Sequence, residues 1–260
     1  MTRRRWIADR VEGDHAYLLG QNAHHLFRVL RAEPGQQFDI AANGVLRLGT
    51  IMHATTHEVE FHLGEEVLSE SLPEVAVYVS IFKFDRMEWA IEKLTELGVA
   101  RIIPVTAART AQHLAKAAEA RVERWRKIVR EAAQQSRRIS PPEMAEPLRV
   151  EAIANTFTNG GIILSEVEEA VSLKAALHGC RLPLALAFGP EGGWTPEEVE
   201  QFKSAGWKSA SLGQTILRAE TAAIAAVAVV MAELEEFSPR RRGDAEVAIS
   251  EIPSESEGSL

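Results

Sequence analysis

The sequence has almost no cysteine and no apolar run long enough to cross a membrane. Cys180 is the only cysteine among the 260 residues, which excludes an internal disulfide and suits a reducing cytoplasm. The longest apolar stretch, residues 222–232, is about half the length of a membrane-spanning helix. Arginines at positions 3 to 5 are not followed by an apolar segment, so the N-terminus lacks the pattern of a secretory signal. These absences predict a cytoplasmic protein.

Lys and Arg are also fewer than Asp and Glu, which gives a net charge of −8. A protein that binds nucleic acid is expected to carry a positive charge instead. The charges are segregated along the chain, however. Residues 101–138 contain ten Lys or Arg against three Glu, and residues 1–31 contain six Arg against three acids. A local RNA-binding surface on an acidic protein is one interpretation of this pattern. Ordinary solvated helix faces are the other.

An apolar content of 46% and a charged content of 25% are typical of a soluble globular protein. The first 70 residues have the pattern of a small β-rich unit with one helix. Its strands should be short, and they are expected at residues 6–9, 37–40, 46–53 and 58–63. The dipeptide Asn43-Gly44 predicts a hairpin turn. The helix is expected at residues 21–31, with Leu26, Val29 and Leu30 on one side.

Three histidines in this unit, His53, His57 and His62, invite a metal-site interpretation. They lack the HExxH arrangement, no cysteine accompanies them, and the segment has the pattern of strands. The sequence therefore predicts no metal site.

Strands and helices alternate from residue 75 onward, after a linker expected at residues 69–73, and this alternation predicts an α/β domain. Asp85 is expected to cap a helix over residues 87–97, with Glu88 completing the capping box and Gly98 ending the helix. A basic helix is expected at residues 115–135. Its apolar side chains, which should face inward, are Val122, Trp125, Val129 and Ala132.

The stretch with the strongest local signals is residues 184–237. An apolar strand, 184–188, precedes a glycine-rich turn, 189–193, and Thr195, Pro196 and Glu198 then supply a capped helix start. The unit repeats in outline, with a strand at 208–212, a second glycine loop, and an Ala/Val-rich helix from about 218. Two glycine loops that leave strand ends in an α/β sheet favour a ligand lying against backbone N–H groups. Two ordinary strand-to-helix turns are the alternative, and neither GxGxxG nor a P-loop is present.

These two motifs carry a resemblance to a known family. GPEGG after an apolar strand, followed by LGQTILRAETA at the start of the last helix, resembles the SPOUT class of methyltransferases. Within that class the chain is similar to the ribosomal small-subunit methyltransferase E family, which methylates N3 of a uridine in 16S ribosomal RNA. HHLFRVLRAEPGQ and EAAQQSRR resemble further stretches of the same family.

The resemblance implies an architecture and a set of partners. It implies a PUA-like RNA-binding β-barrel over residues 1–70 and a SPOUT domain, a parallel sheet with a deep trefoil knot, over residues 74–238. Residues 239–260 lack an apolar pattern and are expected to form a disordered tail. The implied cofactor is S-adenosylmethionine, and the implied partners are 16S ribosomal RNA or the small ribosomal subunit. The apolar last helix favours a homodimer, since SPOUT relatives pair through such helices.

The resemblance also implies site residues. Those implied to bind the cofactor are Leu164, Ser165, Gly189, Pro190, Glu191, Gly192, Gly193, Leu212, Gly213, Ile216, Leu217, Arg218 and Thr221. Together with the charge distribution, the resemblance predicts RNA contacts at Arg3, Arg4, His25, Arg28, Arg31, Arg109, Gln135, Arg137 and Arg138.

Methylation of a uracil N3 requires that this weakly acidic imide lose its proton, so that negative charge develops on the flanking carbonyl oxygens. Arg218 is the best candidate to stabilise that charge, with Arg138 as the second choice. Glu191, Glu220 or a bound water could accept the proton, and the sequence does not choose among them. A structural salt bridge from Arg218 to a nearby Glu is the alternative.

Two other functions compete. A ribose 2′-O-methyltransferase of the same fold is one, although its relatives usually carry an Asn in an SLN-type turn where this chain has ILRAET. A non-enzymatic RNA-binding assembly factor is the other, and binding of S-adenosylmethionine would separate it from an enzyme.

Overall fold

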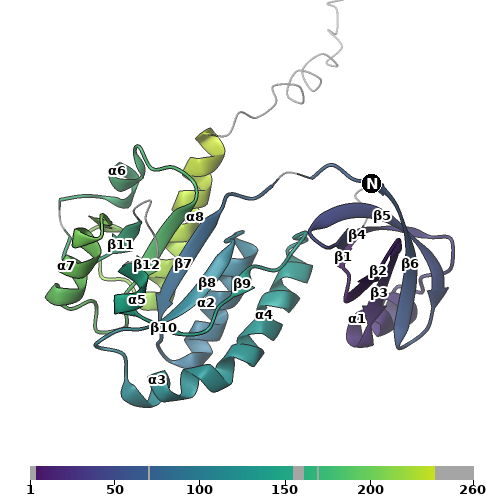
Figure 1. The fold of residues 1–260 in the computed structure, drawn as a ribbon, viewed down its shortest axis with the longest axis horizontal. Coiled ribbons are helices and arrows are strands. Elements are labelled where there is room, and N and C mark those ends of the chain that lie inside the picture. Colours follow the sequence, from purple (N-terminus) through teal and green to yellow (C-terminus); the bar gives the residue numbers. More distant parts are fainter. Residues whose placement is uncertain (1–3, 70, 155–160, 169, 238–260) are drawn as a thin grey trace, which may run out of the picture.

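The computed structural model describes residues 4–69, 71–154, 161–168 and 170–237, and these form two sheets (Figure 1). The first sheet ends at Glu66 and the second begins at Val75. Arg3, one of the predicted RNA contacts, and the predicted disordered tail lie outside the described residues.

The first sheet has six strands in the order β1-β4-β5-β6-β3-β2, and it curls on itself (Figure 1). All its pairings are antiparallel except that of β1 with β4. The strands are β1 Arg5–Ile7, β2 Arg10–Glu12, β3 His15–Leu19, β4 Gln37–Ala42, β5 Val45–Ala54 and β6 Glu58–Glu66. Asn43 and Gly44 both have a positive φ, of 51° and 79°, which confirms the predicted turn between β4 and β5.

The helix predicted over residues 21–31 differs from expectation. A short α-helix, α1 (Gly20–His24), runs into a π-helix, η1 (His25–Val29), in which the N–H of Leu30 donates to the carbonyl of His25. The wider π turn changes which side chains share a face. Leu26 is buried as predicted, but Val29 is 60% exposed, so its predicted place on the apolar side is wrong.

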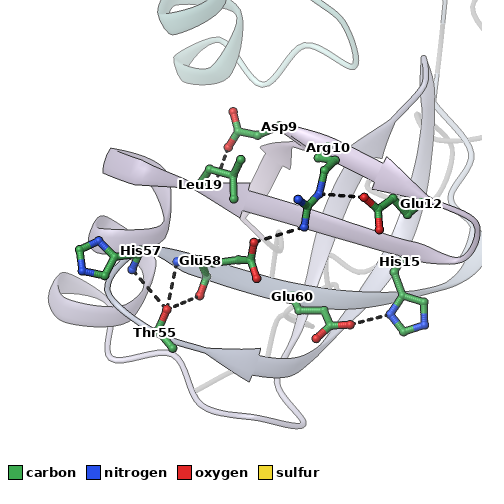
Figure 2. A network of polar contacts seen from close by, with 9 residues as sticks. All are labelled: Asp9, Arg10, Glu12, His15, Leu19, Thr55, His57, Glu58 and Glu60. Carbon is green, nitrogen blue, oxygen red and sulfur yellow. Dashed lines mark hydrogen bonds and ion pairs between the residues drawn. The ribbon is translucent and has the colours of Figure 1, made fainter.

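Polar side chains on β2, β3 and β6 tie these strands together (Figure 2). Arg10 forms ion pairs with Glu12 and Glu58, while His15 Nδ1 lies 2.9 Å from Glu60 Oε1. Each of these exposed pairs contributes little to stability. Their arrangement shows that strands β2 and β3, which no sequence pattern predicted, are joined to β6 through side chains as well as through the backbone.

The second sheet is parallel throughout, with the order β10-β8-β7-β12-β11-β13 and β9 beside β8. Its strands are β7 Val75–Ser80, β8 Arg101–Thr106, β9 Glu143–Met144, β10 Leu148–Arg149, β11 Ile162–Leu164, β12 Leu184–Phe188 and β13 Lys208–Ala210. Its helices are α2 Phe84–Glu96, α3 Gln112–Ala118, η2 Glu119–Arg121, α4 Val122–Gln135, α5 Val150–Ala154, α6 Leu173–Leu177, α7 Pro196–Ser204 and α8 Ala219–Phe237.

Both faces of this sheet are covered, and the alternation of side chains along β7 shows how. Val75, Val77 and Val79 pack in one core with α2, α4, α6 and α8. Ala76 and Tyr78 point to the opposite face, where they pack with α5 and α7. A strand buried on both faces reads as a continuous apolar run, which is why this one was predictable from its sequence.

Three boundaries in this domain differ from the predicted ones. Helix α2 begins at Phe84, whose ring packs against Trp125, so Asp85 lies in the first turn of the helix and does not cap it. The basic helix predicted over residues 115–135 is broken by the 3-10 turn η2 into α3 and α4. Strand β13 ends at Ala210, two residues before its predicted end. The predicted inward side chains of α4 are all buried.

Helix α4 lies between the second sheet and the N-terminal unit that contains the first sheet (Figure 1). The side-chain amide of Gln134 accepts a hydrogen bond from the Ile7 N–H at 2.7 Å and donates one to the Arg5 carbonyl at 2.8 Å. Because β1 is an edge strand, this amide takes the place of a neighbouring strand. Arg130 also pairs with Asp9, whose second carboxylate oxygen accepts the Leu19 N–H (Figure 2).

Candidate functional site

A cavity of about 360 Å³ lies at the carboxyl ends of β11, β12 and β13. In a parallel sheet this edge is the usual place for a ligand. The residues that line it are Arg86, Leu164, Ser165, Glu166, Gly189, Pro190, Glu191, Gly193, Trp194, Ala210, Ser211, Leu212, Gly213, Gln214, Thr215, Ile216, Leu217, Arg218, Ala219 and Ala222.

One wall is the glycine-rich segment between β12 and α7. The Trp194 indole N–H donates to the Leu164 carbonyl at 3.0 Å, which ties this segment to the end of β11. Thr195 and Glu198 form the predicted capping box at the start of α7, with Pro196 in the first turn. The end of the segment that leads into α7 is therefore held both by the Trp194 hydrogen bond and by the capping box.

The opposite wall is the loop between β13 and α8. Gly213 has a φ of +123°, a conformation that side chains other than glycine rarely adopt, and no atom lies within 4 Å of the place where a Cβ would stand. The backbone here faces open space within the cavity wall, so a ligand can approach it closely.

Charge in the cavity is organised by Arg86, which sequence analysis did not identify. Its Nη1 lies 3.2 Å from Glu191 Oε1, and its Nε lies 3.7 Å from Glu220 Oε1. Glu220 is buried, and its Oε2 has no hydrogen-bond partner among the described residues. Arg86 lies in the first turn of α2, where the helix dipole disfavours a cation. A basic residue at this unfavourable position was the one feature of the sequence that could have drawn attention to Arg86.

Arg218 lies at the mouth of α8 and is exposed. Within the part of the chain that the structure describes, its side chain makes no hydrogen bond or ion pair. The carboxylates of Glu191 and Glu220 form their ion pairs with Arg86 instead. The predicted alternative, a salt bridge from Arg218 to one of these glutamates, is therefore not the arrangement observed. A guanidinium group that lines a cavity and has no partner among the described side chains is available to a ligand.

The other predicted site residues divide between the cavity and the rest of the molecule. All those predicted to bind a cofactor line the cavity except Gly192 and Thr221. Arg138 lies elsewhere and is buried, donating to the carbonyls of Thr95 at 2.9 Å, Val99 at 2.8 Å and Ser140 at 3.1 Å. Burial lowers the pKa of Arg138 to about 10, so the group is still protonated at neutral pH.

A second hollow, of about 750 Å³, lies between the N-terminal unit and α4. Four of the predicted RNA contacts line it, and these are Arg4, His25, Gln135 and Arg137. Arg28 and Arg31 are exposed outside it. Arg109 does not line it either, since its guanidinium contacts the Gly192 carbonyl. The hollow is also lined by Arg5, Lys127 and Arg130, of which Lys127 pairs with Glu131 and Arg130 with Asp9. Its lining still contains more Lys and Arg than acidic residues, which makes it an electropositive groove.

The described residues contain no cluster of three His, Cys, Asp or Glu side chains that could hold a metal ion. None of their helices is both long and apolar enough to cross a lipid bilayer.

Comparisons with known proteins agree with this picture. A sequence profile described as an RNA methyltransferase domain matches residues 69–231. The ribosomal RNA small subunit methyltransferase E of Synechocystis sp. is 36% identical over 222 residues, which cover 82% of this chain and 71% of that protein. The protein of the same name from Bacillus subtilis is 31% identical over 232 residues, with 84% and 90% covered.

A solved structure is similar over both sheets. The ribosomal RNA small subunit methyltransferase E from Neisseria gonorrhoeae, which was crystallised bound to S-adenosylmethionine, is 26% identical and superimposes with a TM-score of 0.75. The superposition covers 90% of this chain and 98% of that one.

Proposed function

The chain belongs to the RNA methyltransferase family of the ribosomal RNA small subunit methyltransferases E, and from this premise we propose that it transfers a methyl group from S-adenosylmethionine to N3 of a uridine in 16S ribosomal RNA. The observation that carries the proposal is the cavity at the strand ends, with glycine-rich walls and, at its edge, Arg218, which has no ion-pair or hydrogen-bond partner among the described residues. Its position at the carboxyl edge of a parallel sheet is typical of an enzyme of this fold class.

The residues of the cavity fit the cofactor. Its volume of about 360 Å³ lies in the range of small-molecule sites. The open space over Gly213 and the glycine-rich loop at 189–193 let backbone groups approach a ligand directly, so these two loops would hold the cofactor. When bound, S-adenosylmethionine supplies an electrophilic methyl group attached to a sulfonium.

The chain's own side chains supply the remaining chemistry. Arg218 stabilises the negative charge that develops on the uracil carbonyl oxygens when N3 loses its proton. Glu191 lines the cavity and is half exposed, whereas Glu220 is buried behind Arg86 and does not line it. Of the two carboxylates, Glu191 is therefore the candidate proton acceptor, either directly or through a water.

RNA binding is assigned to the barrel and to the electropositive groove beside α4. In this proposal the barrel over residues 1–70 is PUA-like, and Arg4, His25, Gln135 and Arg137 contact phosphates or bases from the groove. Arg28 and Arg31 extend this surface along the barrel. The domain over residues 74–238 contains the trefoil knot expected of the family, and the protein acts as a homodimer in the cytoplasm, where small subunits are assembled.

The experiment that tests this function has two parts. Calorimetry on the purified protein should show saturable binding of S-adenosylmethionine. Small ribosomal subunits and naked 16S RNA are then incubated with the protein and methyl-labelled cofactor, and the label should appear at a single uridine. A methyl on N3 blocks the Watson–Crick edge, so reverse transcription should stop there.

Each competing function gives a different result. Ribose methylation would leave a phosphodiester bond that resists alkaline cleavage and would not stop the transcriptase. A non-enzymatic assembly factor would bind RNA but not the cofactor.

A further inference from the structure

Arg109 contacts the backbone of the glycine-rich segment without lining the cavity. Its Nη1 donates to the Gly192 carbonyl at 2.7 Å and to the Trp194 carbonyl at 3.2 Å. The stem of the side chain lies against Gly192, since its Cδ and Cβ are 3.4 and 3.5 Å from the place of a Cβ on that residue. Gly193 and Trp194, which Arg109 holds from behind, do line the cavity.

The backbone that carries Arg109 is itself fixed. It lies in a turn after β8 in which the Ala107 N–H donates to Thr110 Oγ1 and the Thr110 N–H donates back to the Ala107 carbonyl, both at 3.0 Å. The next N–H, that of Ala108, donates to Glu198 Oε1 at 2.7 Å. Glu198 is buried, and its other oxygen accepts the Thr195 N–H at 2.8 Å. The turn is therefore docked on the start of α7, and Arg109 projects from a rigid base.

The glycine-rich segment is confined on its other side as well. Gly193 has a φ of +69°, a backbone conformation that other residues rarely adopt, and a Cβ there would stand 2.7 Å from Glu166 Oε1. Gly192 and Gly193 carry no side chains of their own, so the position of this stretch depends on backbone contacts and on side chains from elsewhere. Arg109 supplies two such contacts, to the carbonyls of residues 192 and 194 on either side of Gly193.

We infer that Arg109 is a positioning residue of the cofactor site, which acts by holding the carbonyls of Gly192 and Trp194 so that the wall formed by residues 193 and 194 stays in place. The inference rests on the proposed function, because it takes the ligand of the cavity to be S-adenosylmethionine. It gives Arg109 a role different from the RNA contact that its charge alone suggests. Hydrogen bonds from a charged donor are stronger than those between neutral groups, so the Arg109 guanidinium adds to the Trp194 contact that ties the segment to the end of β11.

The test uses three variants of the full-length protein and one control. Arg109→Met keeps the stem that packs on Gly192 but removes the donors, Arg109→Ala removes both, and Arg109→Lys keeps a charged donor. The control is Arg101→Ala at the other end of β8, where Arg101 forms an exposed ion pair with Glu143. Calorimetry gives the Kd for S-adenosylmethionine without RNA, and hydrogen exchange gives the opening of amides 189–195.

For Arg109→Met we expect the Kd for the cofactor to rise about tenfold, the change that a loss of about 1.4 kcal/mol produces. Amides 189–195 should exchange faster, and the KM for the cofactor should rise while kcat at saturation and RNA affinity are kept. Arg109→Ala should be at least as weak, and Arg109→Lys should recover part of the affinity. Arg101→Ala should match the wild type.

Two results would overturn the inference. If Arg109→Met lowers RNA affinity but leaves the cofactor Kd and the exchange rates unchanged, Arg109 is an RNA contact. If both affinities and the exchange rates stay at the wild-type values, it is neither. Failure of the wild type to bind S-adenosylmethionine would instead contradict the proposed function, and the exchange rates would still decide whether Arg109 holds the segment.

Discussion

At the scale of single residues, Arg218 has the most direct test. Arg218→Ala should lower the rate of methylation by about 100-fold, the scale for the loss of one preorganised charge stabiliser, because its guanidinium has no partner within the described part of the chain and can stabilise charge on the RNA base. Cofactor and RNA affinities should stay close to those of the wild type. Single-turnover kinetics with saturating RNA measure the rate. A wild-type rate would contradict the assignment, and Arg86, the other arginine in the cavity wall, would be the next candidate.

Arg138 should behave in the opposite way. Arg138→Met leaves the buried carbonyls of Thr95 and Val99 and the part-buried carbonyl of Ser140 without their charged donor, so the free energy of unfolding should fall by about 3 kcal/mol. The rate of the folded enzyme should not change, since Arg138 does not line the cavity. Urea denaturation measures the stability. The matched control is Arg137→Met at the neighbouring position. Because the Arg137 side chain is exposed, this substitution should change the free energy of unfolding by no more than about 0.5 kcal/mol. A large loss of rate at unchanged stability would restore Arg138 as a catalytic candidate.

At the scale of elements, local signals predicted the parts of the site that are built from contiguous sequence. The apolar run of β12 and the Thr195-Pro196-Glu198 start of α7 are found where the sequence indicated, because burial on both faces and a capping box each leave a complete signature. Strands β2 and β3 were missed since they are short and half exposed.

The contacts that hold the site were not predictable for a different reason. Arg86 and Arg109 reach the glycine-rich segment from elements about 80 to 105 residues earlier, and only the folded topology brings them there. The π turn of η1 was equally hidden, because an apolar residue at position 29 fits an α-helical stripe just as well.

Substitutions in the loop between β13 and α8 test most directly whether the cavity binds the cofactor. Gly213→Val would place a side chain in the open space of the cavity, so the Kd for S-adenosylmethionine should rise by more than about tenfold. Gln214→Ala should have a much smaller effect, because the loop is expected to bind through its backbone.

Gly179→Val is the matched control for that substitution. Gly179 also has a positive φ, of +77°, and open space at its Cβ, but it does not line the cavity. The backbone strain is therefore shared while the ligand clash is not. Calorimetry separates the two effects, and normal cofactor binding by folded Gly213→Val would show that the site is misplaced.

At the scale of the whole molecule, α8 bears on the predicted homodimer. Its inner side chains are buried, but Val229 is 38% exposed in one copy of the chain, with Ala228 and Ala232 exposed beside it. We expect analytical ultracentrifugation at micromolar concentration to give the mass of a dimer. Val229→Glu should shift that mass toward the monomer because it buries a charge at the contact. Met52→Glu, at an exposed apolar position on the barrel, should not. A monomeric wild type would contradict the prediction.

The placement of the N-terminal unit against α4 bears on RNA binding, since the electropositive groove is lined by residues of both. Gln134→Ala removes the amide that holds the edge of β1, so the groove should lose its fixed width without losing a cation. RNA affinity should fall about tenfold, with the KM for RNA raised and kcat and cofactor affinity kept. The slope of log affinity against log salt should stay the same, because no phosphate contact is removed.

Arg137→Ala provides the comparison that makes this result interpretable. It removes a cation from the same groove but leaves the Gln134 contacts in place, so it should lower the salt slope by about one. Fluorescence anisotropy over a range of salt concentrations measures both variants. If Gln134→Ala also lowers the slope, the amide contributes to a phosphate contact. If it leaves RNA affinity unchanged, the docking of the barrel on α4 has no part in recognition.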